Sequence, residues 1–509
     1  MRARSIGKYS RRHFIGTAAA AGAVLTASFG TKVLADSVGG IASSDFLMLS
    51  ASEIARMIRA KQISAVEAVK ASLSRIDAVN PKINAVVAFC RDRALAEAAE
   101  ADAMLAAGKA RGPLHGVPFT AKDSFDTEGL VSTGGTLGRK DYVPGKDATL
   151  VARVRAAGAI LLGKTNTPEF TLGGGGRGTV NLVYGLTKNP YNTNYQPSGS
   201  SGGAGAIVAA YGSAFDLGSD YGGSIRGPAF ANGIAGIKPT LGRTPRTGHI
   251  VGYGGPFDSF QETGPLARRV EDLALLMPIL CGPDNWDATM APVPLGDPAK
   301  VDLKTLRIAY YKTNGVQEPT AEIQALVDTC VGYFSKLGCK VKEDRPPKMK
   351  ELSDVRQKFE GADGREHIRT LLKKHGTQQA SPGLRLDGDV VGSGDFTRLT
   401  EEMDAIRSEQ LAWMAGYDLI ICPASNRAPI PLDYEPPEGR EAARRGGGYT
   451  SEYNTTGWPA GVVRAGTSTT DPGLPLGIQV VAQPWRDDVV IAAMAHIEKQ
   501  TGGWKAPPI

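Results

Sequence analysis

The sequence has 509 residues, of which 42% are hydrophobic and 22% are charged. These proportions are ordinary for a soluble globular enzyme, and a chain of this length can bury a large core. A formal net charge of +6 would suit a protein that binds nucleic acid or a membrane surface. However, residues 1–35 contain six Lys and Arg residues and no acidic residue. These six account for the whole excess of 58 Lys and Arg over 52 Asp and Glu, so the rest of the chain has no net charge. We therefore expect no nucleic-acid partner.

The first predicted segment is a leader. It begins with basic residues, continues through SRRHFIG at 10–16, and then runs through small apolar residues at 17–30. This order resembles a twin-arginine export signal, with a small residue for cleavage at Ala35. The apolar part is too short for a convincing membrane span. We expect residues 1–35 to be a signal peptide, a periplasmic or secreted mature chain, and no stable membrane insertion after cleavage. An uncleaved anchor is the alternative.

Helical and extended patterns alternate through the first half of the remaining chain. Ser50 or Ser52 can cap a helix whose apolar residues recur every three or four positions, and Asn80-Pro81 should end it. We then expect a helix over 91–107, a strand over 117–121 with Lys122 at its end, a helix over 148–157 and a strand over 159–162. This alternation is typical of an α/β sheet.

The second half continues the alternation around a helical insertion. We expect strands over 306–310, 340–342, 417–422 and 474–481, and helices over 321–336 and 487–499. Residues 349–410 are charged and mostly helical in pattern, and we interpret them as a cap over the sheet. Residues 435–448, with prolines, arginines and three consecutive glycines, predict a loop near a cleft.

The chain offers no pattern for a disulfide framework, a metal site or a cofactor site. Its five cysteines are an odd number without CxxC spacing. No two histidines stand at i and i+4, and the isolated His115 is best explained as a structural histidine. We therefore expect no metal and no cofactor.

Two short motifs match well-known patterns without the context that those patterns need. Residues 158–165, GAILLGKT, match the phosphate-loop pattern, but the Ala-Ile-Leu-Leu that should form the loop has the pattern of a strand. Residues 199–203, GSSGG, match the nucleophile elbow GxSxG with Ser201 at its centre, but a polar run with prolines precedes them instead of a buried strand. No later histidine stands in a recognisable catalytic setting, so a Ser-His-Asp site is not predicted.

Two serine-bearing glycine clusters and one lysine form the most informative part of the chain. Gly199–Gly203 and Gly222–Ser224 each introduce a run of small residues, and glycine beside serine lets backbone N–H groups approach a reacting carbonyl. Each cluster alone is better explained as a tight turn. A lysine that ends a buried strand is costly unless it is paired or used, so the clusters together with Lys122 predict a reactive site.

Three motifs in this region carry a family resemblance. GPLHGVPFTAKD, PSGSSGG and GSDYGGSIRGPA, in this order and with Ser200 and Ser224 24 positions apart, resemble the amidase signature family. A weaker likeness runs from about residue 45 to the C-terminus. The resemblance implies one α/β domain at 36–509, with a large mixed sheet sandwiched by helices. Its signature core would lie at about 110–290 and its helical cap at about 349–410.

The resemblance also implies a role for each residue of the clusters. Ser224 is expected to be the nucleophile, Ser200 a bridging serine after a cis peptide bond at Gly199-Ser200, and Lys122 the base. The oxyanion hole is expected to be formed by the backbone N–H groups of Tyr221, Gly222, Gly223 and Ser224.

The chemistry constrains Lys122 most strongly. An exposed lysine is almost wholly protonated at neutral pH, so a basic Lys122 must have its pKa depressed by burial. Ser201 either supports the proton relay or helps to begin the following helix. Asp220 and Arg226 flank the nucleophile and match family positions, where we favour a structural ion pair or turn brace over chemistry.

We interpret the sequence as that of an exported, cofactor-free amidase, which cleaves a carboxylic amide to an acid and ammonia or an amine through an acyl-enzyme on Ser224. Its partner would be a small-molecule amide. The identity of the substrate, ester cleavage, and a homodimer stay open, as do substrate contacts from the glycine-rich loop at 171–181, including Arg177. The alternatives are a glutamine-hydrolysing amidotransferase subunit, which the leader disfavours, and a non-catalytic binding protein of the same fold.

Overall fold

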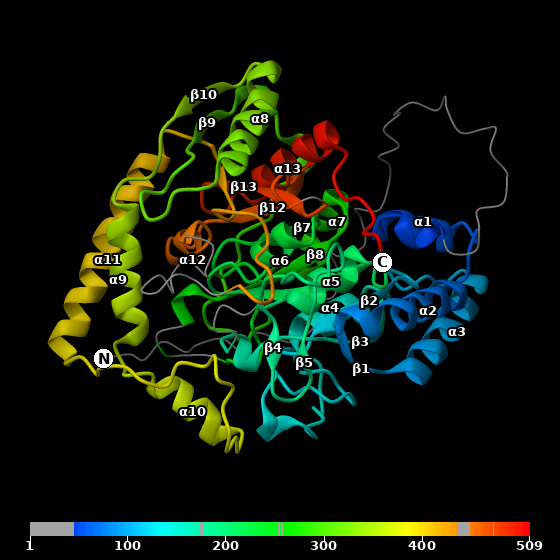
Figure 1. Cartoon of the computed structure of the whole chain (residues 1–509). Helices are drawn as coiled ribbons and strands as arrows, with labels where there is room; N and C mark the ends of the chain where they lie inside the picture. The colour runs from blue at the N-terminus through cyan, green and yellow to red at the C-terminus, as the bar shows by residue number, and fades with distance from the viewer. Residues whose placement is uncertain (1–44, 174–177, 253–254, 256–257, 435–447, 472) are drawn as a thin grey trace, which may run out of the picture. The chain divides into compact units, whose positions relative to one another are not determined.

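The computed structural model describes residues 45–173, 178–252, 255, 258–434, 448–471 and 473–509. The predicted signal peptide, Arg177 and nearly all of the predicted loop at 435–448 lie outside these residues. The described chain from residue 45 onward builds one α/β domain (Figure 1).

The centre of this domain is a mixed sheet with eleven strands within the described residues. From one edge to the other, they are β1 (Val86–Phe89), β3 (Ile160–Thr165), β2 (Pro118–Lys122), β6 (Phe215–Asp220), β8 (Glu262–Ala267), β7 (Ala235–Lys238), β12 (Ala460–Thr467), β13 (Pro475–Ala482), β11 (Leu419–Pro423), β9 (Arg307–Tyr310) and β10 (Lys340–Glu343). A large mixed sheet flanked by helices is the predicted architecture, which is thereby confirmed.

Strand direction decides which strand ends come together. β2 runs parallel to β3 and β6, and β9 runs parallel to β11 and β10, whereas the pairs from β6 across to β11 are antiparallel, as is β1 with β3. Within the pair of β2 and β6, Thr120 lies opposite Asp216. The carboxyl ends of parallel neighbours meet at the same edge of a sheet. Lys122, which ends β2, and Asp220, which ends β6, therefore lie at one edge.

Helices pack on the sheet in two groups. In one, α7 (Val270–Leu280) contacts α1 (Ala51–Arg59), α4 (Thr149–Ala156) and α13 (Asp487–Thr501), which also contacts α8 (Ala321–Leu337). In the other, α2 (Ala65–Ile83) contacts α3 (Arg91–Ala106) and α5 (Gly202–Ala209), which also contacts α6 (Arg226–Ala231). Every residue of β2, β3, β6 and β8 is buried, as expected for strands covered on both faces. Across the described chain, none of the helices has both the length and the apolar character for crossing a bilayer.

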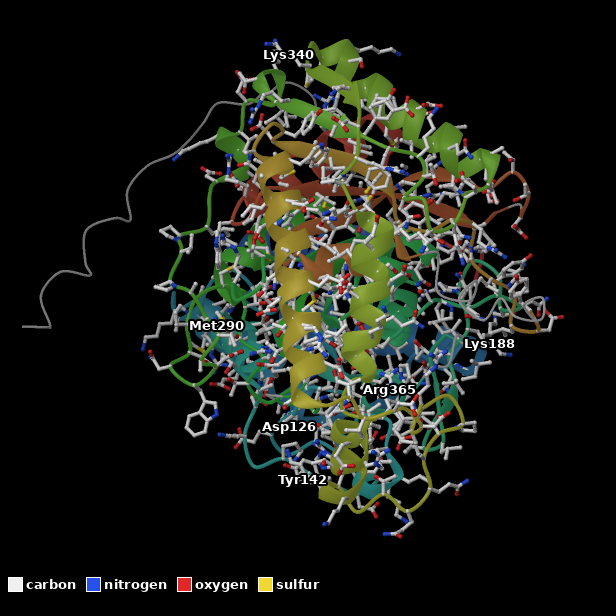
Figure 2. The ribbon with its side chains drawn as sticks, turned by 90° about the vertical axis from the view of Figure 1, so that its left-hand side faces the viewer. Asp126, Tyr142, Lys188, Met290, Lys340 and Arg365 are labelled. Atoms are coloured by element: carbon white, nitrogen blue, oxygen red, sulfur yellow. The ribbon has the colours of Figure 1, made fainter. Side chains whose placement is uncertain are left out.

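A separate helical layer lies within the region predicted to be a cap. It contains α9 (Met349–Gly361), α10 (Glu366–Lys374) and α11 (Ser393–Met414), and α9 and α11 lie side by side (Figures 1 and 2). Apolar residues of α9 and α11 pack around Phe260 and against Tyr221, which precedes the second glycine cluster. This layer is therefore in contact with the predicted site.

The remaining elements are short. They are α12 (Ser451–Thr455), the two-stranded sheet of β4 (Val180–Asn181) and β5 (Gly185–Leu186), and 3₁₀ turns at Asp45–Met48, Leu137–Arg139, Glu169–Thr171, Asp258–Phe260, Pro298–Lys300 and Leu303–Thr305.

The helical region expected from Ser50 or Ser52 to Asn80 forms two helices, α1 and α2. Ser50 caps α1 and Ser64 caps α2, and in each case a glutamate three residues later completes a capping box. We expected Asn80-Pro81 to end α2, but the helix continues two residues past Pro81. A proline in the last turn removes only one backbone hydrogen bond there, and the helix ends where Asn84 takes a left-handed conformation.

β3 is longer than we expected because it includes Lys164. This lysine is fully buried, and its Nζ donates hydrogen bonds to the Phe125 carbonyl and, at 2.8 Å, to Thr127 Oγ1. These acceptors let a lysine occupy a buried strand. A strand cannot wrap its N–H groups around a phosphate, so the GxxxxGKT match at 158–165 does not form a phosphate loop.

Close packing of α5 fixes the chain just after the first glycine cluster. All eight residues of α5 are buried and small or aliphatic. A Cβ atom on Gly203 would clash with the Asn166 amide nitrogen and the Ala85 carbonyl oxygen. Glycine therefore lets α5 lie directly against that backbone, which holds Ser200 and Ser201 at the amino end of the helix.

Candidate active site

Lys122 lies at the centre of the candidate site. Its side chain is fully buried, and Nζ lies 2.6 Å from Ser200 Oγ and 2.9 Å from Ser219 Oγ. Burial lowers the pKa of Lys122 to about 7, although the negative charges of Asp220 and Asp216 oppose this effect. A substantial fraction of this amine is therefore uncharged at neutral pH and able to accept a proton.

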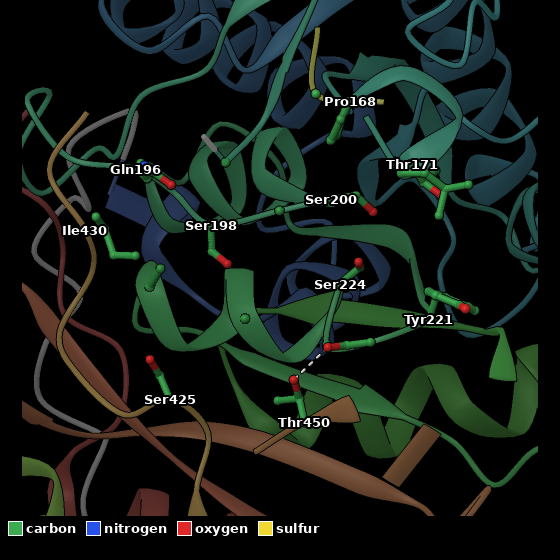
Figure 3. Close-up of a pocket in the computed structure, with 18 of the residues that line it drawn as sticks. Pro168, Thr171, Gln196, Ser198, Ser200, Tyr221, Ser224, Ser425, Ile430 and Thr450 are labelled. Atoms are coloured by element: carbon green, nitrogen blue, oxygen red, sulfur yellow. Dashed lines mark hydrogen bonds between the residues drawn. The ribbon is translucent and has the colours of Figure 1, made fainter. Parts of the chain in front are cut away.

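Ser200 and Ser224 come from different loops and meet at one pocket. Ser200 is 4% exposed and follows a cis peptide bond from Gly199, as expected, whereas Ser224 is half-buried and lies between β6 and α6. Figure 3 shows both side chains at the pocket. Among the described residues, Ser224 Oγ makes no hydrogen bond, so its hydroxyl is not bonded to Ser200. Hydrogen bonds between catalytic groups are often long in the absence of substrate and become shorter when substrate binds.

The pocket above these serines has a volume of about 340 Å³. Its apolar lining includes Leu172, Phe230 and Ile430, and its charged lining includes Glu360 and Arg365 from the helical layer. Both glycine clusters also line it. A substrate that occupies this pocket would contact the signature core and the helical layer at the same time.

Two hydrogen bonds fix the backbone of the second glycine cluster. Arg356 Nη2 donates to the Tyr221 carbonyl at 2.7 Å, and Thr450 Oγ1 donates to the Gly222 carbonyl at 2.7 Å (Figure 3). Because a trans peptide unit is planar with its C=O and N–H opposed, Arg356 also sets the direction of the Gly222 N–H. The Tyr221 ring packs against Phe260 and beside the Arg356 guanidinium.

The four amides expected in the oxyanion hole are not equivalent. The Gly223 N–H donates to Asp220 Oδ1 at 2.8 Å, so it is already occupied. Among the described residues, the amides of Gly222 and Ser224 make no hydrogen bond. These two amides are therefore available to a substrate oxygen, whereas Gly223 contributes its positive φ of 119° to the turn.

Asp220 and Arg226 form a buried brace. Arg226 Nε and Nη2 donate to the two Asp220 carboxylate oxygens at 3.0 and 2.9 Å, and Arg226 Nη2 also donates to Asn454 Oδ1 at 2.6 Å. Burial by itself would raise the pKa of Asp220, but the guanidinium and several N–H donors lower it below its usual value. The geometry supports our preference for a structural ion pair.

Ser201 lies at the start of α5 and contacts the nucleophile segment through its backbone. Its N–H donates to the Ser224 carbonyl at 3.2 Å, and its Oγ donates to the Ser219 carbonyl at 3.4 Å. The Ser201 side chain makes no capping hydrogen bond to α5. It joins the two glycine clusters and, within the described chain, makes no hydrogen bond to Lys122 or Ser200 that would make it a member of the relay.

Sequence reasoning missed Ser219 and His249. His249 Nε2 lies 3.0 Å from Ser219 Oγ, and Nδ1 lies 3.1 Å from Gln261 Nε2. His249 is therefore linked to Lys122 through one hydroxyl group, that of Ser219. No sequence motif marks it, because it lies in an irregular loop that only the fold brings beside β6.

His115 is a structural histidine, as predicted. Its Nδ1 accepts a hydrogen bond from the Arg111 N–H at 3.0 Å, and its Nε2 donates to the Ala101 carbonyl at 3.0 Å. Both ring nitrogens are thus satisfied inside the domain. Within the part of the chain that the structure describes, no group of three or more metal-binding side chains comes together.

The fold and the site together define an α/β protein of the amidase type, with a buried lysine and two glycine-flanked serines at one pocket. The Amidase family model matches residues 67–491, and the chain therefore belongs to the amidase signature family.

Relatives match much or nearly all of the chain. It is 34% identical over 467 residues to an acylamidase of Rhodococcus erythropolis, and the matched region covers 88% of this chain and 95% of the relative. It is 40% identical over 305 residues to a glutamyl-tRNA(Gln) amidotransferase subunit of Carboxydothermus hydrogenoformans, which covers 59% and 61% of the two chains. The solved structure of 6-aminohexanoate cyclic dimer hydrolase with its substrate is similar, with a TM-score of 0.80, 27% identity, and coverage of 91% and 99%.

Proposed function

We propose that this protein is an amidase that hydrolyses a small-molecule carboxylic amide to an acid and ammonia or an amine, with an acyl-enzyme on Ser224. The observation that carries the proposal is the 2.6 Å contact between the buried Lys122 Nζ and Ser200 Oγ, beneath a pocket that Ser224 also lines. Burial of a charged lysine costs free energy, and the two hydroxyl partners of Lys122 Nζ carry no charge that would offset this cost.

In the proposed acylation step, Ser224 Oγ attacks the amide carbon. Its proton passes to Ser200 Oγ while the Ser200 proton passes to the uncharged Lys122 amine. The developing oxyanion accepts hydrogen bonds from the backbone amides of Gly222 and Ser224. This assignment uses two of the four amides expected from the sequence.

The proposed relay then runs in reverse. Lys122 returns a proton through Ser200 to the amide nitrogen, the C–N bond breaks, and ammonia or an amine leaves. Water attacks the remaining ester and loses its proton along the same route, which releases the acid and restores Ser224. The chain's own residues supply every proton transfer in this scheme.

The test is product release from a panel of primary aliphatic amides, aryl amides, long-chain amides and C-terminally amidated peptides. We expect turnover of one class by the wild type, loss of at least ~10³-fold in Ser224→Ala and Lys122→Ala, and normal rates in Ser393→Ala, an exposed serine control. Full activity in Ser224→Ala would rule out the acyl-enzyme, and an inert wild type would favour the binding-protein alternative.

A second candidate is a glutamine-hydrolysing subunit of an amidotransferase. It is supported by the 40% identity to a glutamyl-tRNA(Gln) amidotransferase subunit, over a little more than half of each chain. Glutamine therefore belongs in the same panel. Ammonia release from glutamine that exceeds release from every other amide would favour this candidate, whereas indifference to glutamine would exclude it.

We also propose that residues 1–35 direct export by the twin-arginine route. The support is the sequence SRRHFIG before a short run of small apolar residues. Replacement of Arg11 and Arg12 by lysine should retain the protein in the cytoplasm of the producing cell, measured by fractionation. An unchanged distribution would contradict this route.

A further inference from the structure

Lys122 has a second hydroxyl partner that the proposed relay does not use. Ser219 Oγ lies 2.9 Å from Nζ, nearly as close as Ser200 Oγ. Ser219 is 3% exposed and belongs to β6, so the sheet holds it in place. Its hydroxyl carries one hydrogen and two lone pairs, and the direction of that hydrogen decides whether Ser219 accepts from the lysine or donates to it.

A neighbouring histidine determines that direction. Gln261 Nε2 can only donate, so the 3.1 Å contact makes His249 Nδ1 an acceptor. The neutral ring then carries its hydrogen on Nε2, which donates to Ser219 Oγ over 3.0 Å. The ring is held edge-on to Phe125, with centroids 5.1 Å apart.

Ser219 Oγ has only these two partners among the described residues, His249 and Lys122. Since His249 donates to it, Nζ is the one partner among the described residues that could accept the Ser219 hydrogen. An ammonium group has no lone pair to accept this hydrogen, whereas an uncharged amine has one. We propose that His249 is a positioning residue, which favours the unprotonated form of Lys122 by orienting the Ser219 hydroxyl.

This role rests on the proposed function, in which Lys122 must be uncharged to take the Ser200 proton. Rotation about the Cε–Nζ bond lets the lone pair exchange Ser219 for Ser200. The ring itself stays neutral, because burial and then the nearby positive charges hold the pKa of His249 well below its usual value. The other charged and titratable groups that act on the side chains of Lys122 and His249 are Asp216, Asp220, Lys164, Arg139 and Arg246.

The test uses a fluorophosphonate probe on the full chain and therefore needs no knowledge of the substrate. Ser224 Oγ forms a bond to phosphorus, fluoride leaves, and the Ser224 proton passes toward Lys122. The second-order labelling rate is measured from pH 5 to 9 for the wild type, His249→Leu and His249→Gln. Mass spectrometry and a Ser224→Ala control assign the label.

We expect the acidic limb of the labelling profile to move to higher pH in His249→Leu, by up to about one unit, the equivalent of one hydrogen bond. In His249→Gln, the amide nitrogen can still donate to Ser219, so the acidic limb should return to its wild-type position. His249→Leu should add no shift in a Ser219→Ala background, because the hydroxyl that transmits the effect is gone. His496→Leu, a histidine that contacts Tyr333 and Phe334 instead, is the matched control.

The sign of the shift separates this role from simple packing. A leucine that only filled space would leave Lys122 in drier surroundings, and the limb would stay or move to lower pH. Either result, or an identical profile in the leucine and glutamine variants, would overturn the role of His249. If wild-type Ser224 takes no label at all, the proposed function itself fails, which is a different outcome.

Discussion

Burial gives single ionisable residues most of their properties in this site. Lys122, Asp220, Arg226 and His249 are each at most 4% exposed, yet they differ in charge because their partners differ. Asp220 stays ionised beside a guanidinium. Lys122 Nζ, in contrast, hydrogen-bonds only to hydroxyl groups within the described chain, so the loss of hydration on burial lowers its pKa. The consequences for Lys122 and for the buried brace can each be measured.

The first prediction concerns pH. Because the pKa of Lys122 is lowered to about 7 and its uncharged form is the base, kcat should rise with pH through about 7 and level off above it. Lys122→Arg, which keeps the charge but stays protonated, should lose at least ~10²-fold at every pH. Steady-state rates on whichever amide the panel identifies provide the measurement. A flat profile from pH 5 to 8 would contradict it.

The second prediction concerns the buried brace. Arg226→Met leaves Asp220 charged and without its guanidinium, so the free energy of unfolding should fall by about 3–5 kcal/mol. Arg398→Met, which removes the exposed ion pair with Asp395, should cost less than about 1 kcal/mol. Urea midpoints of the two variants make the comparison. Equal midpoints would show that the brace does not stabilise the domain.

At the scale of elements, the helical layer positions the site as well as lining it. Arg356 of α9 is 6% exposed and joins its helix to two other segments, because its guanidinium donates to the Tyr221 carbonyl and, in α12, to the Ser451 carbonyl and Thr455 Oγ1. The orientation of the Gly222 amide thus depends on a helix more than a hundred positions further along the chain. Thr450, which immediately precedes α12, donates to the Gly222 carbonyl and thereby fixes the next peptide unit, which carries the Gly223 N–H.

A third prediction tests this dependence. Arg356→Met should lower kcat by about tenfold or more with a smaller change in KM, because a misdirected Gly222 amide weakens stabilisation of the oxyanion more than binding of the substrate. Loss of a whole oxyanion donor would cost ~10²–10³-fold, which sets the upper limit. Arg369→Met, in the exposed part of α10, is the control. A rise in KM at constant kcat would instead assign Arg356 to substrate binding.

At the scale of the molecule, the order of the strands brings the reactive groups together. β2 and β6 are neighbours although about a hundred residues separate them, and β8 places Gln261, which precedes it, beside the same edge. The described residues from 45 onward belong to one unit, and every residue assigned to the candidate site lies in it.

The fourth prediction follows from that division. A variant that lacks residues 2–35 should fold, keep its kcat within about twofold of the full chain, and melt within a few degrees of it, measured by steady-state rates and calorimetry. A large loss of activity or a much lower melting temperature would mean that the leader contributes to the folded domain.

The local elements were largely predictable because neighbouring residues encode them. Apolar spacing of three and four marked the helical region of α1 and α2, Ser50 marked its first residue, and a short apolar run placed Lys122 at the end of a strand. The glycine clusters were also visible, since glycine beside serine is informative without any partner. Pro81 and Lys164 misled us about two boundaries, because hydrogen bonds formed elsewhere in the fold decide whether such residues are tolerated.

The sequence by itself thus determined the α/β class, the place of Lys122 at a strand end and the two serine segments. Only the tertiary structure decided that the Gly223 amide is hydrogen-bonded to Asp220 and that Arg356 and Thr450 fix the backbone of the second glycine cluster. It also decided that His249 hydrogen-bonds to Ser219. The reason is physical: periodicity and turn chemistry act between near neighbours, whereas a hydrogen bond between distant side chains exists only after strand order and helix packing have brought their segments within about 3 Å of each other.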